Sequence, residues 1–157
     1  MKCPIDEENI SLSFLFTIFL KSQHQYYKHY LKDQEITIQQ IPVLLKLLNH
    51  EYIYQKDIAN DLKIDNGLLT RNIRKLEDQG YVTRKEDNEN RRQNKISLTP
   101  KGRKFTTKIR DKGIQREEEI MKNTTITRQE LIKIFLEIID NSKEYNEKNI
   151  GGLNARK

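Results

Sequence analysis

Residues 58–98 read IANDLKIDNGLLTRNIRKLEDQGYVTRKEDNENRRQNKISL. The first five letters have the apolar face of a short helix, KID at residues 63–65 makes a turn, and residues 66–78 repeat apolar side chains at the spacing of a second helix. After Gly80, two short alternating segments surround a polar loop and predict a β-hairpin. Two helices, a turn and a basic hairpin in this order indicate a winged helix-turn-helix lobe.

The second of these helices has one apolar stripe and one polar face. Asp65 precedes it and is expected to be its N-cap, because a carboxylate there accepts hydrogen bonds from first-turn amides. At about 100° per residue, Leu69, Ile73 and Leu76 fall on one side and should be buried. The other side then projects groups that suit phosphate oxygens and the guanine edge in the major groove. These outward positions are Gly67, Thr70, Arg71, Arg74 and Lys75.

The charge distribution favours a polyanion as the partner of this face. Residues 55–110 contain fifteen Lys and Arg against eight Asp and Glu, whereas the rest of the chain contains fourteen against fifteen. The whole basic surplus therefore lies in the motif region, as expected of a module that neutralises phosphates. A solvated helix face is the alternative interpretation of Arg71 and Arg74. Gly67 either lets the backbone approach a phosphate closely or is a glycine tolerated at a helix start.

The predicted hairpin supplies a second basic element. Residues 81–85 and 94–98 alternate as strands, and the loop between them, residues 86–93, is too polar to be buried. Arg91 and Arg92 lie at or beside its tip, where an arginine can enter the narrow minor groove of A·T tracts. A flexible loop without a partner is the alternative. The complete set of expected DNA contacts is Asn66, Gly67, Thr70, Arg71, Arg74, Lys75, Arg84, Arg91, Arg92 and Lys95.

Helices are expected on the amino-terminal side of this lobe. The segment from about Glu7 to Leu31 is continuously helix-compatible and densely apolar in its first half. Thr37 and Gln40 have the spacing of a capping box, which predicts a second helix that runs to about Asn49. The short β-branched and aromatic segment 51–55 predicts a stub of strand before the motif.

Two more helices are expected after the hairpin. Thr99 and Pro100 have the N-cap and first-position signature of a long helix that runs to about Met121. Thr127 and Glu130 form another capping box and open a last helix. Its apolar residues recur at helical spacing and are Leu131, Ile134, Phe135, Ile138 and Ile139. The first and last helices are too apolar to be fully exposed on a monomer, so we expect burial between two copies.

Several classes of protein are disfavoured by composition. No apolar run approaches the roughly 20 residues that span a bilayer, and the amino terminus lacks the order of a signal peptide, so we expect a cytoplasmic protein without a membrane contact. The single cysteine, Cys3, excludes an internal disulfide, and His24, His29 and His50 lack metal-pair spacing. Because no phosphate loop, nucleophile elbow or paired-carboxylate motif is found, we expect neither an enzyme nor a cofactor.

From about Ser11 to Lys148 the chain resembles the MarR family of winged-helix transcription regulators. The most specific segment is 87–102, which has the acidic loop, paired arginines and Leu-Thr-x-x-Gly of the family's wing. Segments 55–62, 67–71 and 76–82 are also similar to the family pattern. The chain departs from it at the wing tip, where Asn88 replaces a common Pro and Asn90 replaces an Asp that orients a wing arginine.

The resemblance implies a mainly α fold with a small β-hairpin wing, an α+β class. Residues 1–157 are then one domain, in which helices at about 7–32 and 100–148 form a dimerisation platform and residues 37–98 form the winged-helix DNA-binding lobe. Residues 150–157 are expected to be a disordered tail. A homodimer of this kind would bind double-stranded DNA as a pseudo-palindrome, with half-sites about one helical turn apart.

The implied function is sequence-specific regulation of transcription, in which the protein represses nearby genes. A small aromatic or anionic effector would relieve this repression. Candidate residues for an effector pocket are His24, Tyr27, Tyr30 and Tyr54, although tyrosines at a helix interface are also ordinary packing residues. Oxidation sensing is not expected, because Ser13 occupies the region of the sensing cysteine in relatives and Cys3 lies upstream of it. A winged-helix module that binds an acidic protein is the alternative function.

Overall fold

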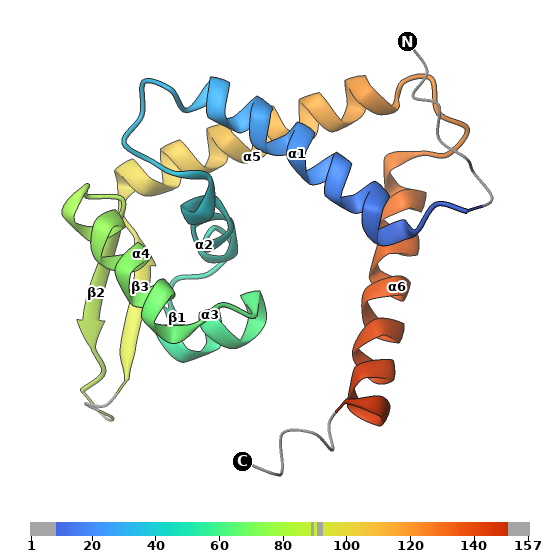
Figure 1. Ribbon diagram of the computed structural model, residues 1–157. Coiled ribbons are helices and arrows are strands. Elements are labelled where there is room, and N and C mark those ends of the chain that lie inside the picture. The colour runs from blue at the N-terminus through green and yellow to red at the C-terminus, as the bar shows by residue number, and fades with distance from the viewer. Residues whose placement is uncertain (1–8, 89, 91–92, 151–157) are drawn as a thin grey trace. The chain divides into compact units, whose positions relative to one another are not determined.

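The computed structural model describes residues 9–88, 90 and 93–150 (Figure 1). The chain forms two compact units, of which the first extends to Lys108 and the second begins at Ile109. In chain order the elements are α1 (Leu12–Tyr30), a 3₁₀ turn η1 (Ile38–Gln40), α2 (Ile41–Leu47), β1 (Ile53–Tyr54), α3 (Gln55–Leu62), α4 (Asn66–Asp78), β2 (Val82–Glu86), β3 (Asn94–Leu98), α5 (Pro100–Met121) and α6 (Arg128–Asn149). The mainly α fold with a small antiparallel sheet is the predicted one.

The helix-turn-helix consists of α3 and α4, as predicted. Lys63 ends α3 in the left-handed conformation, with φ of 52°, and the Ile64 N–H donates to Ala59 O. Asp65 is the N-cap of α4, because its Oδ1 accepts from the Leu68 N–H at 2.9 Å. Both bonds join residues no more than five positions apart in the sequence, which is why the sequence pattern identified this turn correctly.

The hydrophobic core of the first unit is built from α2, α3, α4 and β3. The predicted stripe of Leu69, Ile73 and Leu76 is confirmed, since each is completely buried. The other completely or almost completely buried apolar side chains of this unit include Val43, Leu44, Leu47, Ile58 and Ile96. Burial of this stripe fixes the rotation of α4 about its own axis, because turning the helix would expose these side chains to water.

The sheet has the order β1–β3–β2, with both pairs antiparallel. The predicted strand stub is β1, and its Ile53 pairs with Ile96 of β3. The hairpin of β2 and β3 forms the wing, in which Arg84 also pairs with Ile96 from the opposite edge. Tyr81 falls outside β2, and its N–H donates to Leu76 O at the end of α4. The strand instead includes Glu86.

Two predicted boundaries in the amino-terminal part are wrong. The helix α1 begins at Leu12 and not near residue 7, because Ser11 caps it by accepting from the Phe14 N–H at 3.2 Å. The Thr37 N–H does donate to Gln40 Oε1 at 2.7 Å, but this contact opens the 3₁₀ turn η1. Because Pro42 has no N–H for an α-helical bond to Ile38, the helix α2 follows only from Ile41 and ends at Leu47.

The starts and ends of the last two helices agree with the sequence prediction. Thr99 Oγ1 accepts from the Gly102 N–H at 2.9 Å, and Pro100 is the first residue of α5, which ends at Met121. Thr127 and Glu130 form the predicted capping box of α6, in which the Thr127 N–H donates to Glu130 Oε2 at 2.7 Å. The amphipathic pattern of α6 begins directly after this cap.

The outer helices bury very little within one chain. None of the described residues of α1 is buried, and Phe14 and Leu20 are more than half exposed. None of the described residues of α6 is buried either; Leu136 is 56 % exposed and Ile139 is 45 % exposed. Among the described residues, no helix is both long and apolar enough to span a membrane. Each of these helices thus has an apolar surface that the single chain leaves in contact with water.

The close approach of Gly102 to the Tyr81 carbonyl, at the junction between the wing and α5, can be tested by substitution. A Cβ at this position would lie 1.9 Å from the Tyr81 carbonyl oxygen, which is backbone and cannot rotate away. We predict that Gly102→Ala lowers the free energy of unfolding by about 1–3 kcal/mol, as overpacking usually does. Urea denaturation at one protein concentration measures this change. Lys104→Ala, at an exposed position of the same helix, is the control, and equal stability of the two variants would contradict the contact.

Candidate nucleic-acid interface

The outer face of α4 gathers six of the predicted contact residues. Asn66, Gly67, Thr70, Arg71, Arg74 and Lys75 are all exposed. Asn66 is exposed as the first residue of the helix. The other five lie away from the completely buried stripe, so the same rotation that buries the apolar side chains directs them to solvent. The result is a helix surface rich in hydrogen-bond donors, within a chain of formal net charge +6.

Thr70 differs from the arginines because its hydroxyl is already engaged. Thr70 Oγ1 donates to the Asn66 carbonyl at 2.8 Å and accepts from Gln55 Nε2 at 2.8 Å. A hydroxyl has one proton, so Thr70 can accept a further hydrogen bond but must break the bond to Asn66 before it donates elsewhere. Sequence reasoning missed Gln55 as a residue of this surface, because no local pattern indicates a contact with a residue 15 positions later.

Gly67 has a structural role at the start of α4. A Cβ there would lie 3.1 Å from Asp65 Oδ1, the atom that caps the helix. The missing side chain therefore leaves room for the N-cap carboxylate. The same Cβ would lie 3.9 Å from Arg71 Nη1, so the Arg71 guanidinium extends back toward the first turn of the helix.

The wing presents fewer of the predicted residues. Arg84 is exposed on β2, whereas Lys95 on β3 is only partly exposed. Arg91 and Arg92 lie outside the described residues, as do Cys3 and the tail at 151–157. The loop between the strands is closed by two backbone bonds, from the Asp87 N–H to Gln93 O at 3.0 Å and from the Gln93 N–H to Asn90 O at 2.8 Å.

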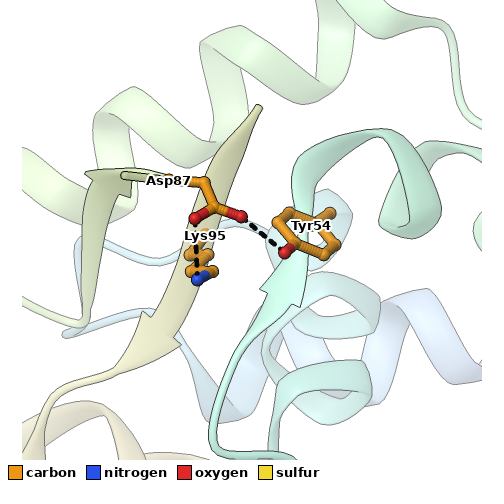
Figure 2. Close-up of polar contacts among 3 residues, drawn as sticks. All are labelled: Tyr54, Asp87 and Lys95. Carbon is orange, nitrogen blue, oxygen red and sulfur yellow. Dashed lines mark hydrogen bonds and ion pairs between the residues drawn. The ribbon is translucent and has the colours of Figure 1, made fainter. Parts of the chain in front are cut away.

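A buried carboxylate joins the wing to β1 (Figure 2). Asp87 is 4 % exposed, and its Oδ2 accepts from the Tyr54 hydroxyl at 2.6 Å while its Oδ1 pairs with Lys95 Nζ at 3.0 Å. The Lys95 ammonium also lies 4.8 Å from the centre of the Tyr52 ring. We call Tyr54, Asp87 and Lys95 the wing-base cluster. Lys95 is therefore paired within the protein, and a phosphate would have to share its charge with Asp87.

The wing-base cluster perturbs the acidity of Tyr54. The hydrogen bond to Asp87, together with partial burial and the negative charge of that carboxylate, raises the pKa of the Tyr54 hydroxyl far above its ordinary value of 10.0. Tyr54 therefore remains protonated and continues to donate to Asp87 at any pH near neutrality.

A pocket of about 190 Å³ lies where the wing meets the helix-turn-helix. It is lined by Tyr54, Gln55, Lys56, Asn66, Gln93 and Asn94. These residues come from the end of β1, the start of α3, the start of α4 and the wing, so an open space lies between these elements at this place. Among the described residues, no group of three or more His, Cys, Asp and Glu side chains could hold a metal ion.

The four residues predicted to line an effector pocket occupy two places. His24 is exposed on α1, and Tyr27 and Tyr30 are partly buried on the same helix. Tyr54 instead belongs to the wing-base cluster, and the pocket that it lines contains no residue of α1. A second pocket, of about 310 Å³, adjoins the end of α1 and includes Lys28 and Lys32 but none of the four. An effector site at these residues stays a prediction.

The sequence of this chain is similar to those of known proteins. The model of the MarR family matches residues 36–93. The regulator SarZ of Staphylococcus haemolyticus is 29 % identical over 137 residues, which is 85 % of this chain and 90 % of SarZ. SarZ of Staphylococcus aureus is 31 % identical over 104 residues, which is 66 % of this chain and 70 % of the relative.

Solved structures share the fold over most of the chain. A crystal structure of MarR has a TM-score of 0.78 with 23 % identity and covers 93 % of this chain and 99 % of that chain. The complex of Staphylococcus aureus MepR with DNA has a TM-score of 0.70 with 22 % identity and covers 87 % of this chain and 99 % of that chain. At these identities the likeness shows the fold.

The pKa of Tyr54 generates a test of the wing-base cluster. We predict that the Tyr54 ring carbon bonded to oxygen keeps its neutral-form ¹³C shift at pH 11, whereas free tyrosine titrates near about pH 10. Because the native state holds this proton more tightly than the unfolded state, the resulting stabilisation is complete below about pH 10 and is lost as the pH rises above it.

Asp87→Asn is the matched variant for this titration, because it removes the charge and retains the shape. It should lower the pKa of Tyr54 toward the ordinary value. Tyr54→Phe assigns the signal. A Tyr54 signal that titrates identically in the wild type and in Asp87→Asn would show that the contact is absent in solution.

Proposed function

The chain belongs to the MarR family of transcriptional regulators, and we propose that it is a homodimer that binds specific double-stranded DNA and represses nearby genes. The observation that carries this proposal is the donor-rich outer face of α4, opposite a completely buried apolar stripe. A helix held in this way can enter the major groove without exposing its core side chains. MepR has the same fold and its structure is solved in complex with DNA, which supports DNA binding as the function of this chain.

We expect two kinds of contact between the protein and DNA. Arg71 and Arg74 on α4 have guanidinium groups that can form paired hydrogen bonds to a guanine edge, and Lys75 is suited to phosphate. Arg84 on the wing, with Arg91 and Arg92 nearby in the sequence, supplies cations for the minor groove or its phosphates. Base contacts on α4 would specify the sequence, and phosphate contacts would set the register.

Dimerisation is supported by the apolar surfaces of α1 and α6. Each helix leaves large aliphatic or aromatic side chains exposed in the single chain, among them Phe14 of α1 and Leu136 of α6. Covering these surfaces with a second copy removes them from water and supplies two DNA-binding lobes. Two lobes fit an inverted repeat whose half-sites are about 34–36 Å apart.

The proposed function includes relief of repression by a small effector. A small aromatic or anionic compound near His24, Tyr27 and Tyr30 would favour a dimer whose lobes have a different spacing, and so would release the operator. The bases of a half-site can be reached only if both lobes keep the correct spacing. We propose that the protein acts in the cytoplasm, where the DNA that it regulates lies.

A mobility-shift titration tests DNA specificity. The wild type should bind the DNA upstream of its own gene more tightly than random duplex of equal length, and binding should weaken steeply with salt. Equal affinity for the two duplexes would favour the alternative, a winged-helix module that binds an acidic protein.

Substitution of Arg71 tests whether this side chain contacts bases. We predict that Arg71→Ala lowers the discrimination between upstream and random DNA by about 1–3 kcal/mol, because a base contact is lost. Arg110→Ala on α5 is the charge-matched control, because Arg110 is exposed and paired with Asp111. It should weaken both duplexes equally. An unchanged ratio in Arg71→Ala would show that Arg71 does not read bases.

Leu136 tests dimerisation separately from DNA binding. We predict that Leu136→Asp converts the dimer into monomers in sedimentation experiments, because a carboxylate would be buried in the apolar interface without a partner. Ser142→Asp, at an exposed polar position of the same helix, adds the same charge and should remain a dimer. A dimeric Leu136→Asp protein would remove α6 from the interface.

A further inference from the structure

Tyr54 and Gln55 are consecutive residues whose side chains bind different parts of the lobe. The Tyr54 hydroxyl donates to Asp87 at the base of the wing, 33 residues later in the chain. Gln55 Nε2 donates to Thr70 Oγ1 on α4, 15 residues later. The junction of β1 and α3 is thus bonded to the wing on one side and to α4 on the other.

Each bond ends in an acceptor that is itself held in place. Asp87 is almost completely buried and is also paired with Lys95, so its position is set by the wing. Thr70 Oγ1 is bonded to the Asn66 carbonyl, so its position is set by the first turns of α4. A movement of either element relative to the junction would break a specific hydrogen bond.

A pocket lies between the start of α4 and the wing at this end of the lobe. The pocket of about 190 Å³ is bordered by Asn66 at the start of α4 and by Gln93 and Asn94 of the wing, together with the two junction residues. None of its lining residues is aliphatic and the pocket is partly open, and the two DNA-facing elements are connected across it through the side chains of Tyr54 and Gln55.

We propose that Tyr54 and Gln55 are positioning residues that set the placement of the wing relative to α4. This inference rests on the proposed function, in which α4 contacts the major groove while the wing contacts the adjacent minor groove. The distance between these contacts is set by the DNA, so a wing that is free to move binds in only a fraction of its conformations. The apparent affinity falls by that fraction.

The first test uses the free protein and therefore does not depend on DNA binding. Tyr54→Phe removes one hydroxyl and keeps the ring. Hydrogen–deuterium exchange of the wing, residues 82–98, should become at least about threefold faster in this variant, while exchange of the core helix α2 stays within error of the wild type. Tyr145→Phe, in the exposed part of α6, is the matched control and should change neither segment.

The second test measures DNA binding in a double-mutant cycle. Tyr54→Phe and Gln55→Met should each weaken binding to the upstream DNA by up to about tenfold, the equivalent of one hydrogen bond. The loss from Tyr54→Phe should shrink in an Arg84→Ala background, because the wing then has less to contribute. A merely structural role would give the same loss in both backgrounds.

The outcomes distinguish failure of the positioning role from failure of the proposed DNA-binding function. Wing exchange that is unchanged in Tyr54→Phe, or that rises together with exchange in α2, would overturn the positioning role whatever the DNA result. Faster wing exchange in the variant, with a wild type that does not prefer its upstream DNA, would support the positioning role and overturn the proposed function. A fully additive cycle would overturn the link between Tyr54 and the wing contact.

Discussion

Burial of the apolar stripe of α4 is the constraint on which the proposed DNA-binding surface depends. Leu69, Ile73 and Leu76 are completely buried, in a core that also includes Ile58 of α3 and Ile96 of β3. Burying an aliphatic side chain of this size contributes about 1.5–3 kcal/mol, which is far more than a solvated arginine contributes by pointing in one direction. The apolar side chains therefore decide the orientation of α4, and Arg71 points outward as a consequence.

The wing is held by a different kind of interaction. It lies beside the core through Val82 and Ile96, and Asp87, directly after β2, also binds the hydroxyl of Tyr54 on β1 and the ammonium of Lys95 on β3. A buried carboxylate needs such partners, because an unpaired one is strongly disfavoured. Directional hydrogen bonds can define the position of a small, mostly polar hairpin, and the proposed contact of the wing with DNA would require a defined position.

The outer helices show how much of the fold one chain leaves incomplete. Hydrophobic residues make up only 35 % of the sequence, and the buried ones are concentrated around the helix-turn-helix. None of the described residues of α1 and α6 is fully buried, although both helices have strongly apolar segments. Helices of this length gain most of their stability from packing of such a face, so a second copy would stabilise the helices as well as pair the lobes.

The sequence by itself determined the elements whose signals are local. Asp65, the Thr99–Pro100 start of α5 and the Thr127–Glu130 box act within one helical turn, and the stripe of α4 repeats at helical spacing, so each could be identified before the structure. The Ser11 cap was a missed signal of the same kind. Only the tertiary structure decided that Tyr54 binds Asp87, that Gln55 binds Thr70 and that Gly102 lies against the Tyr81 carbonyl. These contacts join residues 15 or more positions apart, and no local pattern specifies them because the folding of the intervening chain brings the partners together.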